Sequence, residues 1–161
     1  MAQSARKTVT QSRENALSLL KSDHEEVSEL FEKYERSVER STAQQKAALA
    51  QQICEALTAH AQIDEEIFYP ACHEHVEDAE DLLAEAKVEH ETLKELIAKI
   101  EKAKPGSEEF DAEVKVLGEY VKHHVREEQN ELFPKVRKSE LDLNEVGEQL
   151  AARKEELQAA A

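Results

Sequence analysis

The sequence predicts an all-α protein, an up-down-up-down four-helix bundle with a short extra helix at the C-terminus. The first reason is composition: only 3 glycines, 3 prolines and 4% aromatic residues occur in 161 residues, a balance that suits helices better than strands. The second reason is that apolar residues recur three and four positions apart along four segments, as in amphipathic helices. The four stripes are Leu17, Leu20, Val27, Phe31, Tyr34 and Val38; Ile53, Leu57 and Ile67; Leu83, Leu93, Ile97 and Ile100; and Val114, Leu117 and Val121.

Residues that begin and end helices separate these stripes. Ser41 and Thr42 can cap the second helix and Ser107 the fourth, Pro70 disrupts the end of the second, and Pro105 with Gly106 ends the third. Asp142 and Glu145 form a capping box before Val146, Leu150 and Leu157, which predicts the extra helix. We therefore expect a frayed N-terminal tail over residues 1–12, the bundle over 13–137 and a C-terminal helical extension over 138–161.

The charge and the cysteines restrict the partners and the compartment. With 36 acidic and 21 basic side chains the formal net charge is -15, which repels nucleic acid and anionic lipid. No apolar run approaches the roughly 20 residues of a membrane span, and residues 1–12 lack the apolar core of a secretory signal. Cys54 and Cys72 would lie roughly 27 Å apart along a helix, too far to pair. We expect a cytoplasmic protein with no nucleic-acid or membrane partner.

Polar side chains interrupt the apolar stripes at core positions. The six are His24, His60, Asp64, His90, His124 and Glu128. They belong to an internal repeat, because His60, Asp64 and Pro70 correspond to His124, Glu128 and Pro134, each 64 positions later. One buried histidine is common in a protein core. Six polar residues in two matched sets indicate a functional site.

Loop positions predict that the four histidines share one cross-section of the bundle. Thr42 is midway between His24 and His60, and Ser107 is midway between His90 and His124. Residues equidistant from a short turn lie at one height in an up-down bundle. Asp64 and Glu128 follow their histidines by one helical turn, on the same face of two parallel, diagonally opposite helices.

Two buried carboxylates without Lys or Arg on the stripes would be costly, and metal cations remove that cost. Imidazole and carboxylate ligands without thiolate favour iron, with manganese or zinc as alternatives. If both carboxylates bridge, two irons joined by an oxo or hydroxo bridge each keep one open position. Such a position binds dioxygen, peroxide or nitric oxide.

The pattern His24, His60-x-x-x-Asp64, His90 and His124-x-x-x-Glu128, with the endings Phe-Tyr-Pro and Leu-Phe-Pro, resembles the hemerythrin-like, HHE cation-binding family over about residues 15–137. The resemblance implies a non-haem di-iron centre and roles that vary among members, from oxygen binding and nitric oxide or oxidative-stress responses to iron-sulfur cluster repair and peroxide breakdown.

Two departures from the family pattern bear on function. Oxygen-carrying hemerythrins have a fifth histidine on the third helix, whereas this chain has Ala86 and Lys94 four positions either side of His90. That difference favours redox chemistry or sensing over pure oxygen carriage. Asp64 replaces a usual glutamate and has a shorter side chain, so either Asp64 or Glu65 supplies the carboxylate of the second helix.

Other polar residues lie near these six in the sequence. His123 with Glu127 forms a rival pair on the fourth helix, His73 and His75 fit a solvated loop, and Glu89 fits a carboxylate supporting a ligand histidine. Tyr34 and Tyr69 are expected to pack, with a hydrogen bond near bound dioxygen as the alternative, and Cys54 and Cys72 behave as small apolar residues.

The functional hypothesis is a di-iron protein that binds a small diatomic ligand or peroxide, with a role in oxidative or nitrosative stress or oxygen handling. A peroxidase-like or catalase-like enzyme, an iron donor for iron-sulfur cluster repair and a structural helical adaptor stay open as alternatives.

Overall fold

The computed structural model describes residues 15–160 and is helical throughout, with no strand in that range. Its elements, in chain order, are α1 (Ala16–Ser37), α2 (Ala43–Ile63), the π-helical segment η1 (Asp64–Phe68), α3 (Tyr69–His75), α4 (Glu80–Lys102), α5 (Glu108–Glu127), the π-helical segment η2 (Glu128–Leu132), α6 (Phe133–Arg137) and α7 (Leu143–Ala159). The predicted all-α bundle with an extra C-terminal helix is confirmed. The predicted tail, residues 1–12, lies outside the described residues.

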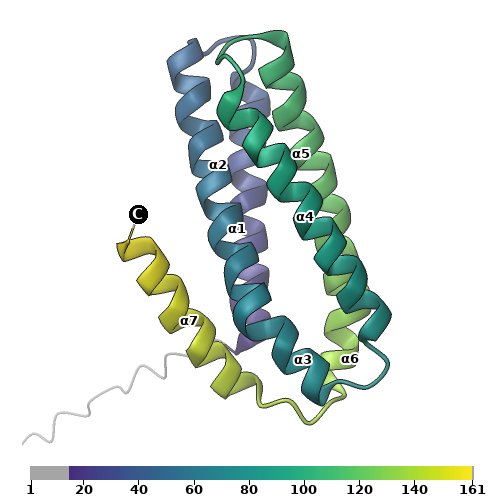
Figure 1. Ribbon diagram of the computed structural model, residues 1–161. Coiled ribbons are helices and arrows are strands. Elements are labelled where there is room, and N and C mark those ends of the chain that lie inside the picture. The colour runs from purple at the N-terminus through teal and green to yellow at the C-terminus, as the bar shows by residue number, and fades with distance from the viewer. Residues whose placement is uncertain (1–14, 161) are drawn as a thin grey trace, which may run out of the picture.

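The long helices α1, α2, α4 and α5 form the bundle (Figure 1). Contacts join α1 to α2, α2 to α4, α4 to α5 and α5 to α1, so α2 and α5 are diagonal partners that run in the same direction. The C-terminal helix α7 packs outside the bundle against α1 and α2. No helix in the described part of the chain is long and apolar enough to cross a membrane.

Side-chain caps begin the helices where the sequence places capping residues. The Thr42 side chain accepts from the backbone N–H of Gln45, and the Gln45 side chain accepts from the backbone N–H of Thr42. The Ser107 side chain accepts from the backbone N–H of Phe110. Asp142 caps α7 by accepting from the N–H groups of Asn144 and Glu145. These bonds satisfy N–H groups that have no partner within the helix.

Pro70 disrupts the regular α-helix at the end of α2, as expected, but the chain does not leave the helical path. The chain stays helical from α2 through η1 into α3, and the same happens around Pro134 from α5 through η2 into α6. Before each proline, the helical turn contains one extra residue, because backbone hydrogen bonds reach back five residues instead of four. The N–H of Tyr69 donates to the carbonyl of Asp64, and the N–H of Phe133 donates to the carbonyl of Glu128. Proline lacks an N–H and crowds the preceding turn of an α-helix, and the π-turn is the local adjustment.

The core consists of two apolar clusters at successive heights. The lower cluster includes Leu20, Ile63, Ala86 and Leu132, and the upper one includes Val27, Leu57, Leu93 and Val121. On each long helix the change from one cluster to the other falls at a predicted histidine: His24, His60, His90 or His124. The polar level is therefore enclosed above and below by apolar side chains.

The loop between α4 and α5 depends on Gly106, whose φ of +84° is in the left-handed region. A Cβ atom there would also lie 2.9 Å from the Cβ of Ala43. We expect Gly106→Ala to lower the free energy of unfolding by about 1–2 kcal/mol, measured by urea denaturation. Lys104→Ala, at an exposed position in the same loop, should change it by less than about 0.5 kcal/mol. Equal stability of the two variants would contradict this role of Gly106.

Candidate metal centre

Four buried imidazoles meet in two pairs inside the bundle. The Nε2 atoms of His24 on α1 and His60 on α2 lie 3.2 Å apart, and so do those of His90 on α4 and His124 on α5. Each pair comes from two helices joined by one loop, as the midpoint argument predicts. All four Nε2 atoms therefore face the interior.

The carboxylates of Asp64 and Glu128 each reach both imidazole pairs. Asp64 Oδ2 lies 3.2 Å from the Nε2 of His60 and 3.9 Å from that of His90. Glu128 Oε2 lies 3.2 Å from the Nε2 of His124, and its Oε1 lies 3.5 Å from that of His24. Two carboxylates in this position can each bridge two ions.

The six side chains divide into two groups suited to metal ions. One group is His24, His60 and Glu128, the other is Asp64, His90 and His124, and within each the ligand atoms lie within 4.8 Å of one another. Two imidazoles and a carboxylate per ion suit iron, manganese or zinc. The structure thus brings together all six residues predicted from the sequence.

The carboxylates show why a cation fits this site. Asp64 is 0% exposed, and neither of its oxygens accepts a hydrogen bond from the described residues. Burial and the nearby Glu128 raise the pKa of Asp64. Burial also acts to raise the pKa of Glu128, but the adjacent imidazoles of His124 and His24 outweigh it and hold that pKa well below its usual range. An uncompensated buried carboxylate is costly, and bound cations would supply the missing charge.

The pKa values of two of these imidazoles shift in opposite directions, because different groups lie beside them. Burial lowers the pKa of His60, but Asp64 and Asp23 outweigh it and raise that pKa well above the usual value. Burial and the adjacent His124 lower the pKa of His90 to about 3. Since imidazole binds metal in its neutral form, protons and cations compete for these nitrogens.

An oxygen atom faces the outer nitrogen of each imidazole. His24 Nδ1 lies 2.9 Å from Gln129 Oε1, and His60 Nδ1 lies 3.0 Å from Asp23 Oδ2. The carboxylates near the other two are more distant: Glu89 Oε1 is 3.4 Å from His124 Nδ1, and Glu65 Oε1 is 3.7 Å from His90 Nδ1. For His24 and His60, the hydrogen-bond partner at Nδ1 favours the tautomer whose Nε2 lone pair can bind a metal.

Sequence comparison decides the family. Residues 15–136 match the model of the hemerythrin HHE cation binding domain. The chain belongs to this family. With two groups of side chains that could hold a metal ion, it is a metal-binding, hemerythrin-like protein.

Two known proteins place this HHE domain in context. A DNA nickase from Nostoc sp. (strain PCC 7120) is 30% identical over 123 residues, which are 76% of this chain and 34% of that protein. The chain therefore spans about a third of the length of this curated relative. A crystal structure of an HHE cation binding domain-containing protein from Mycobacterium kansasii, an Rv2633c homolog, superposes with a TM-score of 0.74 at 22% identity. The match covers 91% of this chain and 88% of that one and shows the shared fold.

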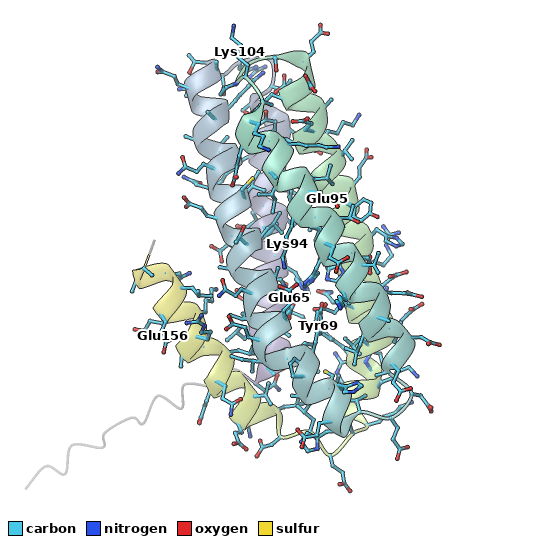
Figure 2. All side chains as sticks on the ribbon, viewed as in Figure 1. Glu65, Tyr69, Lys94, Glu95, Lys104 and Glu156 are labelled. Carbon is cyan, nitrogen blue, oxygen red and sulfur yellow. The ribbon has the colours of Figure 1, made fainter. Side chains whose placement is uncertain are left out.

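Asp64 and Glu65 occupy different environments in this HHE domain. Asp64 faces the imidazoles, whereas both oxygens of Glu65 accept from Lys94 Nζ, at 2.7 and 2.9 Å. Figure 2 shows Glu65 and Lys94 close together between η1 and α4. The sequence left open whether Asp64 or Glu65 supplies the carboxylate of the second helix. In the structure, Asp64 is the carboxylate that lies beside the imidazoles.

Tyr69 lies in the centre, although the sequence favoured a packing role for it (Figure 2). Its hydroxyl donates to Glu128 Oε2 at 2.6 Å and lies 3.2 Å from His90 Nε2 and 3.4 Å from His124 Nε2. Burial and the charges of Asp64 and Glu128 raise the pKa of this hydroxyl well above its usual value, so it keeps its proton. The position of Tyr69 agrees with the alternative interpretation from the sequence, in which its hydroxyl forms hydrogen bonds within the site.

The remaining candidates lie away from the six residues. His73 and His75 are exposed on α3, and Tyr34 donates to Asp111 at 2.7 Å in the upper part of the bundle. His123 forms a third group with Glu89 and Glu127, but its side chain is 60% exposed and outside the core. Cys54 and Cys72 are buried and unpaired, as predicted.

Proposed function

We propose that this chain is a non-haem di-iron protein that binds dioxygen, peroxide or nitric oxide in the core of the bundle. The observation that carries the proposal is the position of the two carboxylates. Asp64 lies between His60 and His90, and Glu128 between His124 and His24, so each can join two ions. Manganese and zinc are the alternative metals for these ligands.

Iron held there would supply a one-electron redox couple and an open coordination position for a small ligand. The protein's own part is to orient the ligands and limit the access of water. The two apolar clusters enclose the level of the four histidines on both sides. They restrict the access of solvent and would influence the redox potential of iron bound there. A pocket of about 310 Å³ between α1 and α5 reaches the edge of His24, so we propose it as the approach for a small ligand.

Tyr69 favours peroxide breakdown as the second candidate function. Its hydroxyl proton lies against Glu128 and beside two imidazole nitrogens, inside a water-poor core. A hydrogen-bond donor held at this point can stabilise the negative charge that develops on a peroxide oxygen as the O–O bond breaks. Simple reversible binding of oxygen does not require this stabilisation.

Nucleic acid is not part of the proposal, although the Nostoc relative is described as a DNA nickase. That protein is about three times as long as the segment matched here. This chain carries a formal net charge of -15. So negative a surface opposes binding to a phosphate backbone.

Metal analysis and spectroscopy test the proposal directly. After iron loading and desalting, mass spectrometry of the metals should find about two irons per chain, a stoichiometry set by the two imidazole pairs. The ultraviolet-visible spectrum should show ligand-to-iron absorption that changes on addition of azide or nitric oxide. A chain that retains no iron, manganese or zinc, or a spectrum unaffected by these ligands, would overturn the proposal. Stopped-flow measurement of peroxide loss separates enzyme from carrier.

Tyr69→Phe should retain iron but consume peroxide more slowly, by about 10- to 100-fold, because it removes one hydroxyl hydrogen-bonded to a ligand carboxylate. Tyr34→Phe is the matched control, since it removes a buried hydroxyl that bonds Asp111 instead. Rates and iron contents are measured on both variants side by side. Equal peroxide rates in the two variants would show that the Tyr69 hydroxyl has no part in the reaction.

A further inference from the structure

The C-terminal helix α7 lies outside the family match, which ends at residue 136, yet it is joined to the metal centre. Leu150 on α7 is completely buried in the lower apolar cluster. Further along α7, Lys154 reaches α1, and its Nζ lies 2.5 Å from Asp23 Oδ1. The other oxygen of Asp23 lies 3.0 Å from His60 Nδ1.

Asp23 therefore connects a cation on α7 with an imidazole of the centre. Its side chain is only 6% exposed, and its two oxygens have separate partners, Lys154 and His60. A buried carboxylate held at both oxygens cannot rotate without losing one of these bonds. If Lys154 were lost, His60 would be the one remaining partner that could neutralise the buried Asp23 carboxylate, among the contacts described.

We propose that Lys154 is a positioning residue for the metal centre: by holding Asp23 it orients the imidazole of His60 with Nε2 toward the metal. The inference rests on the proposed function in taking His60 as a ligand. A carboxylate at the outer nitrogen of a ligand histidine sets its tautomer, its ring orientation and its donor strength. Through Lys154, the helix α7, which the family match does not include, also contributes to the orientation of His60.

A comparison on the opposite side of the centre indicates why the Asp23 contact matters. Lys94 holds Glu65 in a similar way, but Glu65 Oε1 is 3.7 Å from His90 Nδ1. The side chain of Lys94 is 53% exposed, so water screens this pair. The Lys154–Asp23–His60 contact is shorter at the imidazole and less exposed.

Arg153 provides a matched control on the same helix. Its Nε lies 2.8 Å from Glu66 Oε2 in η1, so it also docks α7 onto the bundle. Glu66 is 41% exposed and contacts Gln62 and Arg153 instead of an imidazole. Loss of Arg153 weakens the docking of α7 without removing a partner of any ligand histidine.

The experiment compares Lys154→Met with Arg153→Met in the full chain. In metal-free protein, imidazole nitrogen NMR follows the Nδ1 proton of His60, assigned by its loss in His60→Ala. In Lys154→Met only, we expect the signal of this proton to shift and the proton itself to exchange faster with water. Cobalt(II) titration should show about tenfold weaker binding in Lys154→Met and less than twofold change in Arg153→Met. Lys154→Arg should restore both properties.

Asp23→Asn gives an independent measure if Lys154→Met alone fails to fold. Lys154→Met in the Asp23→Asn background should have no further effect on the His60 signal, because the link is already broken. An unchanged His60 signal in Lys154→Met, or an equal change in Arg153→Met, would overturn the inference. If the NMR signals separate as expected but the wild type binds no metal, the proposed function fails while the positioning of His60 by Lys154 stands.

Discussion

His60→Ala and His124→Ala are each expected to remove most of the bound iron, with affinity lowered by at least about 100-fold. Changes to residues that merely support a ligand cost about 10- to 100-fold, and loss of the ligand itself should cost more. Each variant leaves its group with one imidazole and one carboxylate. Iron per chain is measured by mass spectrometry after loading and desalting.

His73→Ala is the control for these variants because His73 is exposed on α3. It should keep the iron content of the wild type. Circular dichroism of the metal-free proteins checks that all three variants stay folded, so that lost iron is not lost structure. Equal iron contents in the three variants would contradict the assignment of His60 and His124 as ligands.

The positions of the six buried residues could be predicted because helical periodicity and short loops determine them. His24 falls between Leu20 and Val27 on its stripe, and His90 falls between Ala86 and Leu93. The turns near Thr42 and Ser107 then bring the paired histidines to one height. In an up-down bundle the heights follow from counting residues, so the sequence contains this information.

The partners around the ligands could not be predicted in the same way. Asp23 and Gln129 contact imidazoles of other helices, and such contacts depend on the rotation of each helix and the reach of each side chain. Tyr69 follows η1, and one extra residue in a π-turn rotates the following side chains by about 100° relative to a regular helix. A stripe drawn with regular periodicity therefore misplaces Tyr69. The matching prolines were the available signal for these turns.

Asp64→Asn is expected to stabilise the metal-free protein by about 1–3 kcal/mol, the cost of a buried polar group without a hydrogen bond, while lowering its iron content. The wild-type carboxylate is completely buried, accepts no hydrogen bond from the described residues and lies near Glu128, so its charge destabilises the metal-free fold. The same charge stabilises a bound cation. Urea denaturation of metal-free protein and metal analysis of loaded protein measure the two opposite effects.

The dependence on pH has a definite sign. Burial and Glu128 raise the pKa of Asp64 in the folded state above its unfolded value. Ionised Asp64 therefore destabilises the metal-free fold above that raised pKa, and the penalty is relieved as the pH falls and the carboxyl takes up a proton. The difference in the free energy of unfolding between Asp64→Asn and the wild type should therefore narrow as the pH falls through the raised pKa of Asp64.

Glu65→Gln is the matched control, because Glu65 is the neighbouring carboxylate in η1 and is paired with the exposed Lys94. It should change the metal-free stability by less than about 0.5 kcal/mol and leave the iron content unchanged. If Glu65→Gln lost iron while Asp64→Asn retained it, Glu65 would be the ligand and the inner position of Asp64 would have another cause. A metal-free Asp64→Asn less stable than the wild type would show that the buried charge is compensated without metal.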